Sequence, residues 1–283
     1  MIRRNRYLLV LMALLAALSL FAAACGEEEP TTPAGGDGED TEAPEFTTLE
    51  DGVLTVGSDI PYPPFEFKKE GELIGLDMDL VNEIADRLGL TTKIIDTGFD
   101  TIFTQLAGGR YDVVIAASTI TPEREEQVNF SDPYYNAQQS LTVNTTERDD
   151  IKSVDDLQDG DVIAVQGGTT GKAWAEDNLA EGIEIRSFPE GPDGYTALEA
   201  GDVDGVINDE PTALAEIAGR EGLELVQQIP TGESYGIAVD PENEELLDAI
   251  NEVLAEIIED GTYDDIYGSY PDLPPGGNIA QTG

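Results

Sequence analysis

The chain has 283 residues and a formal net charge of −45, from 59 acidic and 14 basic residues, and it contains one cysteine and no histidine. This composition excludes a disulfide within the chain, histidine-based metal sites, Ser-His-Asp triads and Cys-His pairs. The length suits one large domain or two lobes of about 100 residues each, and so acidic a surface repels nucleic acid, which we therefore do not expect as a partner.

Residues 1–24 have the pattern of an export signal peptide, because three arginines lie among the first six residues and an apolar stretch follows over 7–21. Small residues then precede the lone Cys25 and resemble the bacterial lipoprotein cleavage box, which predicts lipidation of Cys25. An uncleaved transmembrane anchor is the alternative. Both tether the protein to the outer face of the cytoplasmic membrane, extracellular or periplasmic. Residues 25–50, rich in Glu, Pro, Thr, Gly and Asp, predict a flexible acidic linker.

A strand predicted over 54–57 leads into a proline-rich loop that carries Asp59 and Tyr62. The prolines restrict the loop, so the ring of Tyr62 cannot swing freely. From these residues alone, Tyr62 is either an ordinary core residue or part of a binding surface. A helix over 77–88 and a strand over 93–95 follow, and Phe99 then precedes a short helix at 101–107.

The most informative stretch is 113–135, which reads VVIAASTITPEREEQVNFSDPYY. A buried strand runs through the hydroxyl residues Ser118 and Thr119 into a helix that a Thr-Pro pair opens. Arg124 lies in the first turn of this helix, where a cation opposes the helix dipole. A carboxylate ligand suits this combination of a strand end, two hydroxyls, helix amides and a guanidinium. The alternative is that Arg124 pairs with neighbouring glutamates on a solvated face.

A second group of polar residues follows two later strands. The strand predicted over 162–166 ends in Gln166, and the glycine-rich turn 167–171 after it points main-chain N–H groups at whatever docks there. This turn lacks the lysine and the spacing of a Walker loop, and tight packing is its alternative explanation. A further strand ends near Asp209, which either caps the next helix or accepts hydrogen bonds from a ligand.

Strands alternate with helices along the remaining chain, which predicts α/β lobes with mostly parallel sheets. The other strands are expected at 140–143, 183–188, 203–207 and 223–228, and the other helices at 195–200, 211–218, 243–259 and 263–270. The residues from Pro271 onward predict a loose tail.

The segments STITPERE and VNFSDPYY closely resemble the signature of the polar amino-acid family of bacterial extracellular solute-binding proteins, family 3, the receptors of ABC importers. The flanking chain agrees from about Val53 to Tyr270. The resemblance implies a two-lobed α/β fold of the periplasmic-binding-protein type (type II) with two hinge crossovers and the ligand between the lobes. It implies that lobe 1 comprises 51–142 and 233–270, that lobe 2 comprises 143–232, and that 271–283 form the tail.

The resemblance also implies roles for individual residues. Arg124 and the main chain of Thr170 bind the ligand carboxylate, and Asp209 binds the α-ammonium group. Ala116 and Ala117 stand where some binders of basic amino acids carry serines, so only their main-chain groups remain for a ligand. The complete implied ligand-binding set is Asp59, Tyr62, Phe99, Ala117, Thr119, Arg124, Gln166, Thr170 and Asp209.

The function implied is that of a monomeric, lipid-anchored receptor without metal or cofactor. It would close on a polar amino acid, arginine or glutamine being favoured, and deliver it to the transmembrane subunits of an ABC permease. No bond would be made or broken. The alternatives are a periplasmic cyclohexadienyl or arogenate-type dehydratase on the same fold, or a receptor for a solute that is not an amino acid. Against the dehydratase, no acid directly follows the threonines of the turn 167–171.

Overall fold

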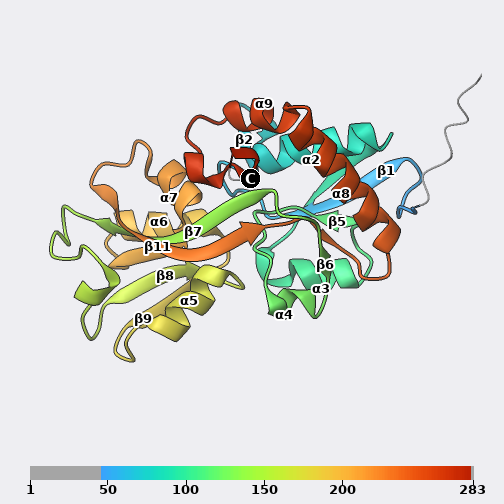
Figure 1. Cartoon of the computed structure of the whole chain (residues 1–283). Coiled ribbons are helices and arrows are strands. Elements are labelled where there is room, and N and C mark those ends of the chain that lie inside the picture. Colours follow the sequence, from blue (N-terminus) through green and yellow to red (C-terminus); the bar gives the residue numbers. More distant parts are fainter. Residues whose placement is uncertain (1–45, 282–283) are drawn as a thin grey trace, which may run out of the picture. The chain divides into compact units, whose positions relative to one another are not determined.

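The computed structural model describes residues 46–281 (Figure 1). The chain divides into two units, and every described residue lies in the second of them, which comprises 43–283. The expected signal peptide, the lipidation site Cys25 and most of the expected linker lie outside the described residues. Within the described part, no helix combines the length and the apolar character needed to cross a membrane.

The first sheet has five strands in the order β4-β1-β5-β12-β6. Strand β1 pairs in parallel with β4 and β5, and β12 pairs antiparallel with β5 and β6. The strands are β1 Val53–Ser58, β4 Thr91–Asp96, β5 Val113–Val114, β6 Asn129–Phe130 and β12 Ala238–Val239. A small hairpin and several helices belong to the same part of the chain. They are the strands β2 Phe67–Lys69 and β3 Glu72–Ile74 and the helices α2 Leu76–Arg87, η1 Phe99–Thr101, α3 Ile102–Ala107, α4 Pro122–Glu125, α8 Glu244–Glu259 and α9 Thr262–Gly268.

The second sheet also has five strands, in the order β11-β7-β10-β8-β9. Its strands are β7 Tyr135–Asn144, β8 Val162–Gln166, β9 Glu184–Phe188, β10 Gly205–Asp209 and β11 Leu223–Tyr235. Helices lie in the segments between these strands: η2 Val154–Asp156, α5 Thr170–Asn178, α6 Gly191–Glu199 and α7 Glu210–Ile217. We call the part built on the first sheet lobe 1 and the part built on the second sheet lobe 2.

Separate hydrophobic cores support the two sheets. In lobe 1, α8 buries Leu246, Ile250 and Ile257 at helical spacing and packs against α2 and β12, as an amphipathic helix on a sheet should. In lobe 2, apolar residues of β8 and β10 pack against α5 and α6. The polar ends of the strands are therefore left free for other contacts.

The two strands that join the lobes are longer than expected. β7 and β11 run antiparallel with Tyr135 opposite Tyr235 and Asn144 opposite Leu223 (Figure 1). The expected lobe limits at 142/143 and 232/233 therefore fall inside continuous strands, and the chain changes sheet between β6 and β7 and between β11 and β12. Polar residues near these strand ends concealed the strands in the sequence, because their side chains face a polar site.

The expectation of a loose tail is wrong for the described residues 271–281. Leu273 and Asn278 are buried, and Asn278 forms a β-bridge with Tyr135 of β7. The hydroxyl of Tyr267 donates to the carbonyl of Pro274 at 2.5 Å. Gly277 approaches the ring of Tyr135 so closely that a Cβ atom would lie 2.2 Å from it. Glycine and proline there serve close packing, which composition alone does not distinguish from disorder.

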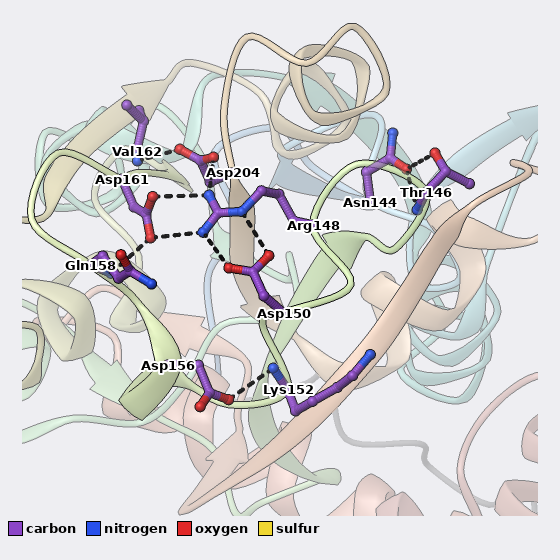
Figure 2. A network of polar contacts seen from close by, with 10 residues as sticks. All are labelled: Asn144, Thr146, Arg148, Asp150, Lys152, Asp156, Gln158, Asp161, Val162 and Asp204. Carbon is purple, nitrogen blue, oxygen red and sulfur yellow. Dashed lines mark hydrogen bonds and ion pairs between the residues drawn. The ribbon is translucent and has the colours of Figure 1, made fainter.

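A polar cluster lies where the strands β8 and β10 begin (Figure 2). The guanidinium of Arg148 forms ion pairs with Asp150 at 3.1 Å, with Asp161 at 2.9 Å and with Asp204. Asp161 and Asp204 also accept hydrogen bonds from the main-chain N–H groups of Gln158 and Val162. The cluster thus fixes the loops that lead into both strands.

Candidate functional site

The structure brings all nine expected ligand-binding residues to one cavity between the lobes. Ala116 and Thr169 complete its lining. The cavity is small, about 10 Å³ over the positions that the centre of a water molecule can take. That volume holds about one water molecule and is too small for a whole amino acid. The lining residues are Asp59, Tyr62, Phe99, Ala116, Ala117, Thr119, Arg124, Gln166, Thr169, Thr170 and Asp209.

Arg124 is the buried cation of this site, with 8% of its surface exposed. Its guanidinium donates to the carbonyl oxygens of Thr119 at 2.7 Å and Gly168 at 3.2 Å, and so it touches both lobes. It also lies over the rings of Phe99 and Phe103, 5.1 and 4.9 Å from their centroids, which favours a cation.

The sequence-based alternative, in which Arg124 pairs with neighbouring glutamates, is wrong. No ion pair within residues 46–281 includes Arg124. Burial lowers the pKa of its guanidinium, and the nearby carboxylates of Asp209 and Glu233 oppose this effect. Two of its five N–H donors reach carbonyl oxygens, so the remaining fork is free to bind a carboxylate.

Asp209 is the buried carboxylate of lobe 2, at the end of β10 with 6% exposure. It accepts hydrogen bonds from the hydroxyls of Tyr62, at 2.9 Å, and Tyr235, and from the amide of Gln139. Burial first, and the charge of Glu233 second, raise its pKa to about 6. Although Asp209 precedes α7, its side chain makes no capping hydrogen bond, so the capping alternative is wrong.

Asp59 and Gln166 close the other end of the cavity. Gln166 donates its amide to Asp59 at 2.6 Å across the lobes. Burial raises the pKa of Asp59 to about 7, and the charges of Asp96 and Glu190 add to the increase. This end of the site is therefore acidic and lacks a basic partner among the described ion pairs, which suits a basic or amide group.

The hydroxyl groups are arranged differently from the expectation. Ser118 is fully buried and donates to the carbonyl of Ala116 at 3.3 Å, so it is directed away from the cavity. Thr119 and Thr170 each donate to the carboxylate of Glu233 at 3.0 Å. A ligand carboxylate is therefore left to Arg124 and to main-chain N–H groups.

The main chain at Ala117 has an unusual conformation, with φ at +44°. Such a value is strained for a residue with a side chain, and the surroundings must hold it. Asp77 does so by accepting the N–H of Ala117 at 2.7 Å and the hydroxyl of Tyr134 at 2.9 Å. Burial raises the pKa of Asp77 to about 7. Asp77 thus positions the main chain of a cavity-lining residue without lining the cavity itself.

Sequence reasoning missed three polar residues of the site, namely Asp77, Gln139 and Glu233. Each stands in or next to an element whose other residues look structural. A signal for Gln139 existed, because a polar pair Gln138-Gln139 within a strand of the core sheet needs partners. Glu233 follows a Pro-Thr-Gly turn at the expected lobe boundary 232/233, where a connecting segment is expected and not a site residue.

These features define the class of protein. Two α/β lobes joined by a pair of long strands enclose a cavity with one buried guanidinium and two buried carboxylates. The model of bacterial extracellular solute-binding proteins, family 3, matches residues 54–272. The chain belongs to this family, and its fold is the two-lobed type II fold of periplasmic amino-acid-binding proteins.

Three known proteins illustrate the similarity. The L-cystine-binding protein TcyJ of Escherichia coli (strain K12) is 32% identical over 75% of this chain and 80% of its own length. An ancestral arginine-binding protein bound to glutamine is 40% identical, with a TM-score of 0.75 over 79% of this chain and all of the other. An ancestral amino acid-binding protein, a precursor of cyclohexadienyl dehydratase, is 36% identical, with a TM-score of 0.72 over 77% and 95% of the two chains.

Proposed function

We propose that this chain is an extracytoplasmic receptor that binds a polar amino acid between its lobes and delivers it to the permease of an ABC importer. One observation carries the proposal. A buried guanidinium, Arg124, and a buried carboxylate, Asp209, line the same cavity from opposite lobes, and neither has an ion-pair partner among residues 46–281. The carboxylate and ammonium groups of an α-amino acid complement these two charges.

Arginine and glutamine are the favoured ligands. The far end of the cavity carries the carboxylate of Asp59 and the amide of Gln166, which can bind a guanidinium or an amide side chain. The similarity to an ancestral arginine-binding protein bound to glutamine supports this choice. Because the ligand would contact both lobes, it would favour the closed arrangement, which the permease can recognise.

A dehydratase is the second candidate, because one similar structure is a precursor of cyclohexadienyl dehydratase. Such an enzyme needs a carboxylic acid that donates a proton to the leaving hydroxyl. Asp209 instead accepts three hydrogen bonds, which oppose the effect of burial on its pKa. With a pKa of about 6 it is mostly ionised at pH 7 and suits an ammonium group. Release of phenylpyruvate from prephenate by the purified protein would support the enzyme, and no release is expected.

The lipid anchor and the monomeric state complete the proposal. Cys25 would carry the lipid, and the linker would hold the receptor away from the bilayer. Replacement of Cys25 by serine should release the protein from the membrane, which fractionation and mass spectrometry of the N-terminal peptide can measure.

The decisive experiment is isothermal titration of the purified protein with the common amino acids, after ligand removal by unfolding and refolding. One or two polar amino acids should bind, and binding should raise the melting temperature, since a ligand at a hundredfold excess over Kd adds about 2.7 kcal/mol of stability. If no amino acid binds while the protein is folded, the assignment to amino acids is wrong.

A further inference from the structure

The strand β11 contains a bulge next to an acidic side chain that contacts two residues lining the cavity. Ile229 pairs with Gln139 and Glu233 pairs with Ala137, so β11 contains two more residues than β7 between these two pairs. The intervening segment includes Gly232, whose φ of +70° few other residues adopt. Bulges next to binding sites commonly redirect a side chain. Here the redirected residue is Glu233, at the junction of the two lobes.

Glu233 connects residues of both lobes. One carboxylate oxygen accepts the hydroxyl of Thr119, from lobe 1, and the hydroxyl of Thr170, from lobe 2, each at 3.0 Å. A hydroxyl group has a single proton to donate and two lone pairs that accept. Because both hydroxyls donate to Glu233, the threonine oxygens can serve a ligand as acceptors only, and that of Thr170 already accepts the amide of Gln139 at 3.3 Å, which leaves it one lone pair.

Glu233 also lies close to Asp209. The amide nitrogen of Gln139 donates to Asp209 and to Glu233, the latter at 3.2 Å, so the two carboxylates share one donor. The charge of Glu233 is the second largest cause of the raised pKa of Asp209. In the described part of the chain neither carboxylate forms an ion pair. Two neighbouring negative charges repel each other, and a cation between them relieves the repulsion.

We propose that Glu233 is a second specificity residue for the ammonium group of the ligand and forms, with Asp209, a subsite of two carboxylates. The hydroxyl oxygens of Thr119 and Thr170 accept from the same ammonium group, while Arg124 binds the carboxylate. The inference rests on the proposed binding of an α-amino acid. It implies that the receptor rejects carboxylic acids that have the same side chain but no amine.

The test compares arginine with 5-guanidinopentanoate, and glutamine with 4-carbamoylbutanoate; each second compound lacks only the α-amine. Glu233→Gln should weaken the amino acid about tenfold or more, since a hydrogen bond to a charged group contributes on this scale. The affinity of this variant for the amine-free compound should be unchanged or higher. Glu224→Gln is the matched control, because this exposed glutamate of β11 accepts the hydroxyl of Thr145 away from the residues that line the cavity and its loss changes the net charge equally.

The outcomes separate the inference from the function on which it rests. An equal loss for both members of a pair, or no change, would overturn the role of Glu233 while leaving the receptor intact. If the unaltered protein binds no amino acid, the proposed function itself fails. Should Glu233→Gln not fold, Thr170→Val removes one hydroxyl that Glu233 orients, and the same selective loss of the amino acid is expected from it.

Discussion

The two ends of strands β8 and β10 carry opposite kinds of arginine site. Where the strands begin, Arg148 is surrounded by Asp150, Asp161 and Asp204 (Figure 2). Where they end, Gln166 and Asp209 face a cavity that contains Arg124 from lobe 1. In α/β sheets, ligands bind outside the carboxyl ends of the strands, so the two ends have different tasks.

The two arginines differ in the groups that accept hydrogen bonds from the guanidinium. Arg148 is bound by carboxylates, and its side chain is still 22% exposed. Arg124 is more deeply buried, and carbonyl oxygens and aromatic rings surround it. In a chain with 59 acidic residues, an arginine without a carboxylate partner is unexpected. Stability alone favours the first arrangement, so the second indicates a binding function.

The acidic residues show the same contrast. The hydrogen bonds of Arg148 lower the pKa of Asp161, so the folded state favours its charge. Burial raises the pKa of Asp59 to about 7 and that of Asp209 to about 6, so the folded state disfavours theirs. A raised carboxylate pKa means that stability falls as the pH rises from the unfolded value to the folded one. The buried carboxylates of the cleft therefore destabilise the folded protein at neutral pH, and a bound cationic ligand should offset this loss.

The first prediction concerns Arg124. Arg124→Met should weaken amino-acid binding at least about 100-fold, because a desolvated bidentate pair with the ligand carboxylate is lost. The free energy of unfolding should change little by comparison. Titration calorimetry and chemical denaturation measure the two effects. Arg186→Met, at a partly exposed arginine of lobe 2 that pairs with Glu184, is the control and should leave binding unchanged. Unaltered affinity in Arg124→Met would contradict the site.

The second prediction concerns Asp59. Asp59→Asn should raise the free energy of unfolding at pH 8 by about 2 kcal/mol, because one pKa unit corresponds to about 1.4 kcal/mol and a buried amide retains part of the cost. The gain should vanish below the unfolded pKa of 3.8, at about pH 3, where the carboxyl group of Asp59 is protonated in both the folded and the unfolded state. Denaturation at the two pH values measures it. A lower free energy of unfolding for Asp59→Asn at pH 8 would show instead that the folded state stabilises the charge of Asp59.

The third prediction concerns Arg148. Arg148→Met should lower the free energy of unfolding by about 1 to 2 kcal/mol at pH 7, because it leaves three carboxylates together in a partly exposed place. Affinity for the amino acid should not change once the protein is folded. The loss should shrink on acidification, since Asp161 is protonated as the pH falls through its lowered pKa. A change in affinity of the same size as that of Arg124→Met would erase the contrast between the two ends.

The cavity was predictable to the extent that short motifs encode it. Arg124, Thr119 and Asp59 follow strand ends within local patterns, and the structure assembles them as the resemblance implied. The same local reasoning gave most helices within a few residues. α2 was expected over 77–88 and spans Leu76–Arg87. Periodicity decides such elements because their apolar faces are continuous.

The parts that were not predictable depend on distant contacts. Glu233 became part of the site through a bulge and through partners from 63 to 114 residues away. The tail after α9 is ordered because Gly277 and Asn278 fit against Tyr135, and nothing nearby in the sequence records this fit. Polar residues of β7 and β11 likewise looked like loop residues. Their role appears only when both lobes are present.

The smallest expected effect tests the acidic end of the cavity by its pH dependence. Arginine should bind the charged form of Asp59, whose pKa in the unoccupied site is about 7, and binding must then release a proton at lower pH. Glutamine carries an uncharged amide and can bind either form. The preference for arginine over glutamine should therefore increase about tenfold between pH 6 and pH 8, as Asp59 loses its proton.

A ratio of affinities makes this measurement specific. Asp209 also titrates, with a pKa of about 6, but in the proposed site it would face the ammonium group that both ligands share, so its effect should cancel. Asp96 and Glu190 strengthen the acidic field at Asp59. Asp59→Asn should make the ratio independent of pH, because it removes the titrating group. A ratio that still rises with pH in this variant would move the recognition of the ligand side chain from Asp59 to these neighbouring acids.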